Sequence, residues 1–173
     1  YGIQNGYAGL IHGDYKKMNQ SDFSGILTIG GTILGTSRQP FKMMRVIEDE
    51  NSIDKVAAMK DNYKKMGLDC LVILGGNGTH KTANLLSEEG LNVVTMPKTI
   101  DNDLCGIDHC PGFGSAAKYI STVFCELEQE ITVYEPKNVI IVEMMGRHAG
   151  WLTAAAALAE GKNGNVPYLV YLE

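Results

Sequence analysis

Two carboxylates stand close together in the segment Pro97–Asp103, which reads Pro-Lys-Thr-Ile-Asp-Asn-Asp. Asp101 and Asp103 follow the amine of Lys98 and the hydroxyl of Thr99. A strand that leads into such a turn carries acid, amine and hydroxyl groups to the carboxyl edge of a sheet, where open α/β sheets bind ligands. Taken alone, the segment is more simply interpreted as a polar surface loop, so a chemical role depends on what lies beside it.

A glycine-rich turn, Gly75–Thr79, lies between an apolar run and an amphipathic segment. Its sequence is Gly-Gly-Asn-Gly-Thr, and glycines let the backbone approach a ligand closely because they lack a Cβ atom. A helix after such a turn points its N–H groups and the positive end of its dipole at the turn, which favours phosphate. The spacing is neither that of a Walker A loop nor G-x-G-x-x-G. A tight strand-to-helix turn explains the string equally well.

Two further segments carry groups that bind anions. Gly30–Arg38 contains three glycines together with hydroxyl side chains and a guanidinium, a composition that can surround an anion. Met145–Arg147 follows an apolar run and also ends in a guanidinium. In isolation, the first of these segments is better explained as an ordinary connecting loop.

Apolar runs and amphipathic segments alternate along most of the chain. Runs that predict strands lie at Cys70–Leu74, Leu91–Met96, Lys137–Glu143 and Tyr168–Leu172. Periodic patterns that predict helices lie at Ser52–Met66, His80–Glu89, Gly112–Glu130 and Trp151–Ala159. The glycine-rich stretch Tyr1–Leu10 predicts a strand end that passes into a turn. This alternation predicts an α/β fold, with a three-layer, Rossmann-like parallel sheet that has helices on both faces.

The loops that follow three of these strands would meet at one edge of a parallel sheet. They are the glycine turn, the carboxylate segment and the segment that ends at Arg147. A phosphate cradle, a pair of acids and an arginine would therefore converge. Phosphoryl transfer needs these parts, because donor phosphates must be held, a hydroxyl proton accepted and charge on the moving group neutralised.

Composition limits the class of protein. The chain has 173 residues, of which 45% are hydrophobic, and this suits one domain. A net charge of −5 argues against a nucleic-acid partner, because proteins that bind nucleic acid carry a basic excess. Four cysteines without C-x-x-C spacing predict neither a zinc site nor a disulfide framework. With no apolar run of membrane-spanning length and no visible signal peptide, we expect a cytoplasmic location and no membrane partner.

Four sequence blocks together resemble the phosphofructokinases, which phosphorylate fructose 6-phosphate at its 1-hydroxyl group. The blocks are Gly30-Gly31-Thr32 with Leu34-Gly35 and Arg38, then Gly75–Thr79, then Pro97–Asp103, and finally Glu143-x-Met145-Gly146-Arg147-x-x-Gly150 with Leu152-Thr153. They occur in the family's order, and as a set they are highly specific. The resemblance implies a phosphotransferase of glycolysis, with a sugar phosphate and a phosphoryl donor as its small-molecule partners.

The resemblance also implies roles for individual residues. Asp101 matches the family's proton acceptor, and Thr99 and Asp103 match neighbours that hold the sugar and help to place the metal–phosphate unit. Arg147 would neutralise charge on the transferring group. Residues implied in donor-phosphate binding are Tyr7, Arg38, Gly76, Asn77, Gly78, Thr79 and Lys98, with Tyr7 the weakest match. Residues implied in substrate binding are Thr99, Ile100, Asp101, Met145, Gly146 and Arg147.

Three positions bear on the metal and the donor. Asn77 stands where the family usually has an aspartate that helps to hold Mg²⁺, and a neutral amide is a poorer ligand for this cation. Asp103 is then the remaining protein ligand that the resemblance implies for Mg²⁺. Gly78 is typical of members that use ATP, whereas Lys98 is typical of members that use pyrophosphate. We favour ATP as the donor and keep pyrophosphate as the alternative.

The resemblance covers most of the family's N-terminal, donor-binding domain. The chain begins at Tyr1 rather than at a methionine and ends in a predicted strand, so we expect residues 1–173 to be one domain that is truncated at both ends. Our hypothesis is that this chain alone is catalytically weak or inactive, and that the full-length protein is a homo-oligomer. Sugar phosphorylation by the purified 173-residue chain would contradict the first part.

Two other interpretations remain open. Asn77 is compatible with a non-catalytic regulatory subunit that keeps the phosphofructokinase fold. NAD kinases and lipid kinases share the Gly-Gly-x-Gly-Thr turn on a related fold. They do not combine it with Thr-Ile-Asp-Asn-Asp and Met-Gly-Arg, so these kinases are the weaker alternative.

Overall fold

The computed structural model describes residues 1–47, 53–160 and 169–172. The chain divides into two compact units, one made of Tyr1–Ile73 with Gly78–Thr95 and the other of Leu74–Asn77 with Met96–Glu173. The elements of the first part of the chain are β1 (Gly2–Ile3), α1 (Tyr7–His12), β2 (Tyr15–Lys16), the 3₁₀ turns η1 (Gln20–Phe23), η2 (Ile26–Thr28) and η3 (Phe41–Met43), and α2 (Lys55–Lys65). They are followed by β3 (Leu71–Gly75), α3 (Asn77–Glu88), β4 (Val93–Pro97), α4 (Phe113–Val133), α5 (Trp151–Ala155) and the 3₁₀ helix η4 (Ala156–Ala159).

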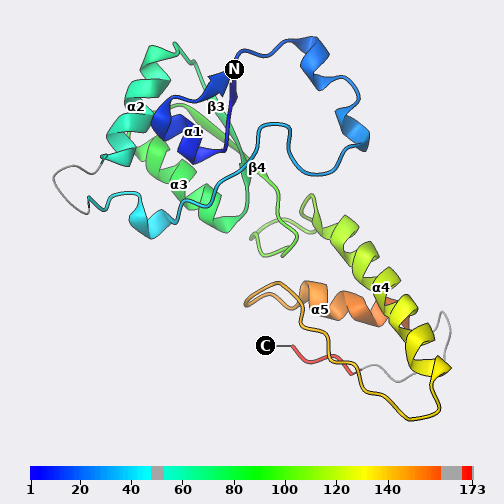
Figure 1. Cartoon of the computed structure of the whole chain (residues 1–173). Helices are drawn as coiled ribbons and strands as arrows, with labels where there is room; N and C mark the ends of the chain where they lie inside the picture. The colour runs from blue at the N-terminus through cyan, green and yellow to red at the C-terminus, as the bar shows by residue number, and fades with distance from the viewer. Residues whose placement is uncertain (48–52, 161–168, 173) are drawn as a thin grey trace. The chain divides into compact units, whose positions relative to one another are not determined.

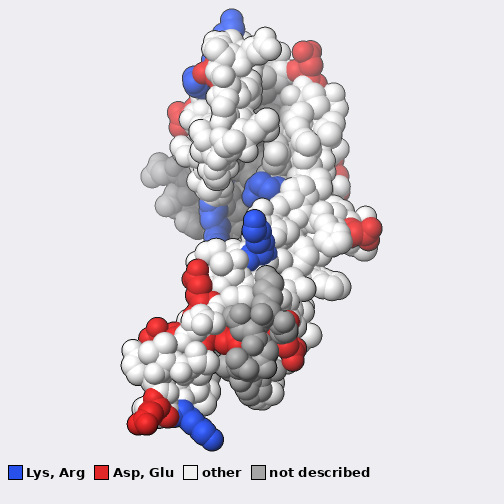
Figure 2. All heavy atoms as spheres, turned by 90° about the vertical axis from the view of Figure 1, so that its right-hand side faces the viewer, with Lys and Arg blue, Asp and Glu red and all other residues white. Residues whose placement is uncertain are grey.

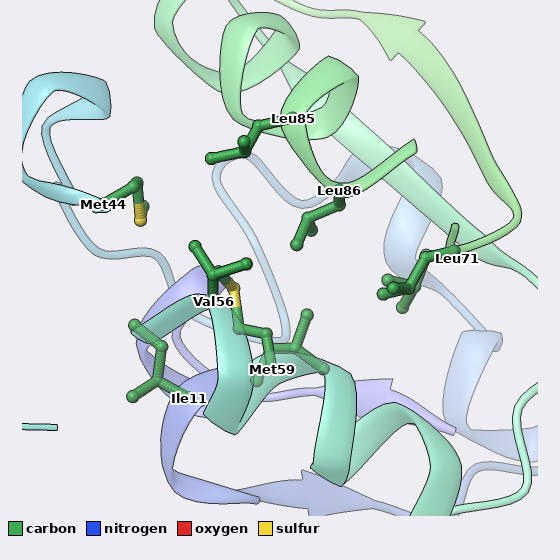
Figure 3. Close-up of a cluster of buried hydrophobic side chains, with 9 residues drawn as sticks. Ile11, Met44, Val56, Met59, Leu71, Leu85 and Leu86 are labelled. Carbon is green, nitrogen blue, oxygen red and sulfur yellow. The ribbon is translucent and has the colours of Figure 1, made fainter. Parts of the chain in front are cut away.

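The core of the first unit lies where α1, α2 and α3 meet β3 (Figure 1). Figure 3 shows apolar side chains of these elements pointing toward one another, together with Met44, which follows η3. The buried members are Leu10, Ile11, Met44, Val56, Met59, Leu71, Leu85, Leu86 and Leu91. Helix α3 places Leu85 and Leu86 on this cluster, as the apolar spacing of its sequence predicts.

Two polar side chains stabilise α2 and its contact with α1. Asp54 caps the helix, because its carboxylate accepts a hydrogen bond from the backbone N–H of Ala57 at 2.9 Å. Asn62 donates from Nδ2 to the carbonyl oxygens of Leu10 and Ile11, both at 2.9 Å. These carbonyls lie in the last turn of α1, where they lack partners within the helix. Asn62 therefore ties the end of α1 to α2.

Strands β3 and β4 are hydrogen-bonded neighbours and run in parallel. Leu71 N–H donates to the carbonyl of Asn92 at 2.9 Å, and Lys98 N–H donates to the carbonyl of Gly75 at 2.9 Å. The predicted α/β class is thus confirmed, with α3 as the crossover helix. Side chains alternate along β3, since Leu71 is buried whereas Val72 and Leu74 are more than half exposed. The described residues therefore cover one face of this strand pair.

In the second unit, α4 packs on α5 and η4. The contact is formed by Ile120 of α4 with Leu152 and Ala156, and Phe113, Ala116, Phe124 and Met144 surround it. Ala155, Ala156 and Ala159 are all buried, so small side chains permit the close approach of the two helical segments. The predicted helix Trp151–Ala159 exists, although its second half is a 3₁₀ helix.

Several predicted boundaries change. Helix α3 begins at Asn77 rather than at His80, and α2 begins at Lys55, whereas the predicted cap Ser52 lies outside the described residues. The predicted strand at residues 137–143 is wrong, because these residues form no strand, and Val139 and Ile141 are 88% and 92% exposed. An apolar run becomes a strand only when a neighbouring strand pairs with its backbone. Residues 169–172 also form no strand, and Tyr168 lies outside the described part.

Candidate functional site

The glycine turn after β3 lies directly beside the start of the carboxylate segment. A Cβ atom added to Gly76 would lie 3.4 Å from Cβ of Thr99 and 3.6 Å from its Oγ1. The hydrogen bond from Lys98 N–H to the Gly75 carbonyl joins the two segments one residue earlier. The carboxyl ends of two parallel strands therefore bring two of the three predicted loops to one edge. The third loop, which carries Arg147, does not follow a strand, because residues 137–143 form none.

Helix α3 (Asn77–Glu88) begins at this turn. It has 12 residues and no acidic side chain in its first turn. The first N–H groups of a helix have no partner within the helix, and its dipole places partial positive charge there. Gly78, which has no side chain, is exposed, so its backbone is accessible to a ligand. This geometry suits the binding of a phosphate group.

Tyr7 supports the first turn of α3 from α1. Its hydroxyl donates a hydrogen bond to the carbonyl oxygen of Thr79 at 2.8 Å, although the two residues are 72 positions apart. Burial raises the pKa of the Tyr7 hydroxyl above its ordinary value, so the group stays protonated and remains a donor. The resemblance places Tyr7 on the nucleotide side of the site, whereas here its hydroxyl contacts the protein backbone.

Tyr7→Phe removes this hydroxyl and little else. A single hydrogen bond contributes about 0.5–1.5 kcal/mol, so in the full-length protein we expect the KM for the donor to rise roughly 2- to 12-fold with a smaller change in kcat. Steady-state kinetics with the donor varied checks this. Tyr119→Phe is the matched control, because Tyr119 on α4 is 70% exposed. An unchanged donor KM for Tyr7→Phe would contradict a supporting role.

The carboxylate loop, residues 99–112, is closed at its base. Thr99 N–H donates to the carbonyl of Pro111 at 3.1 Å, and Thr99 and Gly112 form an isolated parallel bridge. Within the loop, Asp101 N–H donates to Oγ1 of Thr99 at 3.2 Å. Thr99 therefore supports the backbone of the acid two residues later. Asp101 is half-buried and Asp103 is exposed.

An open cavity of about 990 Å³ lies between this loop and helices α4 and α5. Asn102, Asp103 and His109 line it on the loop side, and Phe113 and Trp151 are among the residues on the helical side. Asp101 is not part of this lining. The two carboxylates of the segment therefore do not share one pocket wall.

Arg147 lies in a strained turn just before α5. Gly146 has φ of 142° and is buried, and Arg147 itself has φ of 52°. Ala149 N–H donates to the Gly146 carbonyl at 2.9 Å, and a Cβ atom on Gly146 would collide with the carbonyl oxygen of Ala149. The turn thus requires glycine at position 146 and projects Arg147 into solvent. Within the described residues, no hydrogen bond or ion pair joins Arg147 to Asp101.

The segment that carries Arg38 is tied to the start of α1. Ser37 Oγ donates to the carbonyl of Asn5 at 2.6 Å and accepts from Ala8 N–H at 3.4 Å. Asn5 has φ of 55°, a conformation that asparagine tolerates better than most residues. Arg38 is exposed. The sequence analysis did not identify Ser37 as a residue that holds this segment in place. Its position next to Arg38, an implied phosphate ligand, is the sequence feature that could have identified it.

The residues present fit a Mg²⁺ ion only if the donor supplies most of its ligands. Asn77 and Asp103 are both exposed, and among the described residues no group of three or more His, Cys, Asp or Glu side chains lies close enough to hold a metal. Mg²⁺ is commonly bound by one or two carboxylates together with substrate phosphates and water. Asp103 can supply such a carboxylate.

The described surface carries charges of both signs (Figure 2). Figure 2 shows both acidic and basic side chains of the described residues on the visible face. In the described part of the chain, no helix combines the length and the apolar character needed to cross a membrane.

Comparison with known sequences gives consistent matches over nearly the whole chain. The phosphofructokinase family model matches residues 1–169. The chain is 51% identical to the ATP-dependent 6-phosphofructokinase of Spirochaeta thermophila over 162 residues, which cover 92% of this chain and 44% of that protein. It is 41% identical to the ATP-dependent 6-phosphofructokinase of Propionibacterium freudenreichii over 173 residues, 98% of this chain and 45% of that protein. The chain thus spans less than half the length of these relatives.

Solved structures agree with this result. The chain is similar to a pyrophosphate-dependent phosphofructokinase from Marinobacter aquaeolei, with a TM-score of 0.74 and 27% identity over 97% of this chain and 42% of that one. It is also similar to a phosphofructokinase from Saccharomyces cerevisiae, with a TM-score of 0.78 and 29% identity over 92% of this chain and 23% of that one. Both ATP and pyrophosphate thus occur in the names of its relatives.

Proposed function

Because this chain belongs to the phosphofructokinase family, we propose that it is the donor-binding domain of an ATP-dependent 6-phosphofructokinase. The full-length enzyme would transfer a phosphoryl group from ATP to the 1-hydroxyl of fructose 6-phosphate and give fructose 1,6-bisphosphate. The single observation that carries this proposal is the contact of Gly76 with Thr99, which joins a phosphate-binding turn to a loop that holds an acid. We extend the proposal to a cytoplasmic enzyme of glycolysis that forms a homo-oligomer.

The proposed roles follow from the chemistry of each group. The N–H groups at the start of α3, together with Arg38 and Lys98, hold donor phosphates. Asp101 accepts the proton of the sugar hydroxyl as that oxygen attacks, and Thr99 supports the Asp101 backbone. The turn at residues 145–147 binds the sugar phosphate, and Arg147 offsets negative charge on the transferring group. Asp103 would hold Mg²⁺, which when bound neutralises charge on the donor phosphates.

Pyrophosphate is the second candidate donor. Lys98 favours it, and one similar solved structure is named as a pyrophosphate-dependent phosphofructokinase. The more similar curated relatives are named as ATP-dependent enzymes, and Gly78 is compatible with ATP. A regulatory subunit without activity remains compatible with Asn77, and absence of turnover would favour it.

One assay tests the function and the donor together. The full-length protein that contains this chain is incubated with fructose 6-phosphate, Mg²⁺ and either ATP or pyrophosphate, and fructose 1,6-bisphosphate is measured. We expect kcat/KM to be higher with ATP. A higher kcat/KM with pyrophosphate would reverse the donor assignment, whereas no product with either donor would overturn the proposed function.

A further inference from the structure

Asn102 stands between the two carboxylates of the loop and has an unusual backbone conformation. Its φ is 53°, in the left-handed region, and the residue is only 8% exposed. Asparagine is among the few residues other than glycine that adopt this conformation readily. Residues on either side of an extended residue point the same way. Because Asn102 is in the left-handed region, this pattern is broken, and the side chains of Asp101 and Asp103 point in different directions.

The side chain of Asn102 spans the loop. Its Oδ1 accepts a hydrogen bond from Cys110 N–H at 2.8 Å, and its Nδ2 donates to the carbonyl oxygen of Asp108 at 3.0 Å. Both the oxygen and the nitrogen of the amide are thus bonded to the second arm of the loop, which leads back to Gly112. Because the amide is buried, losing either bond would leave a backbone group without a partner.

The base of the loop is held by other contacts. Thr99 pairs with Pro111 and Gly112, and Phe113 N–H donates to the Cys110 carbonyl at 3.0 Å. A change at Asn102 therefore frees the part of the loop that carries the acids, while the closure of the loop and α4 keep their own contacts.

From these contacts we propose that Asn102 is a positioning residue, which holds the carboxylate of Asp101 in place by joining the two arms of the loop. This inference rests on the proposed function, because it assumes that Asp101 is the base. A displacement of about 1 Å in a reacting group lowers the rate by about 10²-fold. Loss of the amide therefore affects kcat more than substrate affinity.

The test uses Asn102→Gly in the full-length enzyme, because glycine keeps access to positive φ and removes both side-chain hydrogen bonds. We expect kcat to fall roughly 10- to 100-fold with the donor KM within about twofold. Asn92→Gly is the matched control, because the Asn92 amide also donates to a backbone carbonyl, that of Asp69, but in another loop. The control is expected to keep the wild-type kcat.

A double-mutant cycle separates positioning from a general loss of structure. When Asp101 is already Asn, Asn102→Gly should lower the residual kcat less than about threefold, because the group that it positions is gone. An equal loss in both backgrounds, or no loss in the wild-type background, overturns the inference. If Asn102→Gly does not fold, Asn102→Asp replaces it in the same cycle, because it keeps the acceptor for Cys110 N–H and loses the donor to Asp108.

The failure of this inference differs from the failure of the proposed function. An active wild-type enzyme whose kcat is unchanged by Asn102→Gly overturns the role of Asn102 alone. A wild-type enzyme that gives no product with either donor overturns both.

Discussion

Replacing Asp101 with asparagine in the full-length protein is expected to lower kcat for fructose 6-phosphate by about 10²- to 10⁴-fold, the usual contribution of a general base. The amide has nearly the same shape as the carboxylate but cannot take up the sugar proton. Thr99 Oγ1 bonds to the backbone N–H of residue 101, so this support of the loop does not depend on the side chain that is changed. The donor KM should therefore stay near its wild-type value.

The measurement is steady-state kinetics with a separate binding titration for the donor. Asp101→Ser should abolish turnover in the same way and leave donor binding intact. Asp108→Asn is the control, because Asp108 is an exposed acid on the same loop. The substitution leaves in place its backbone carbonyl, which accepts the hydrogen bond from Asn102. A rate for Asp101→Asn equal to that of the wild type would refute Asp101 as the base.

Replacing Arg147 with methionine should lower kcat by about 10²- to 10³-fold, the usual loss when one preorganised group that stabilises transition-state charge is removed. Arg147→Lys should recover part of this loss, because it restores the charge but not the planar fork of donors. Both replacements are unbranched at Cβ, which limits added strain at a residue whose φ is 52°.

Kinetics with fructose 6-phosphate varied also report on sugar-phosphate binding, so a rise in its KM is expected beside the fall in kcat. Arg45→Met is the control, because Arg45 is exposed and pairs with Glu89 at 3.0 Å, and neither residue belongs to the proposed site. If Arg147→Met has the wild-type kcat and KM, Arg147 takes no part in the reaction.

The central strand–turn–helix–strand unit could be predicted closely from the sequence. The apolar run at residues 70–74 became β3 with a shift of one residue, and α3 and β4 followed in the predicted order. These elements are specified locally, because hydrophobic periodicity and the flanking glycines act over a few residues. The parallel pairing of β3 and β4 then places their two loops at one edge.

Helix α1 was not predicted, because its six residues contain a glycine and give too short a pattern to be recognised. It is held instead by the amide of Asn62, which donates to carbonyls of its last turn, and by the hydroxyl of Ser37, which accepts from Ala8 N–H. Both side chains come from distant parts of the chain. The dependence of an element on distant parts of the chain also explains why the strand prediction at residues 137–143 was wrong. Their composition favours a strand, but a strand also requires a paired neighbour, and the described structure provides none.

The amino-acid sequence by itself determined the α/β class, the glycine turn before α3 and the acids that follow β4, because each depends on residue type and short-range spacing. Only the tertiary structure decided that the Tyr7 hydroxyl contacts the Thr79 carbonyl and that the Asn102 amide joins the arms of the carboxylate loop. Directional hydrogen bonds between residues far apart in sequence depend on how the chain packs. The order of residue types along the sequence therefore does not show which of these hydrogen bonds form.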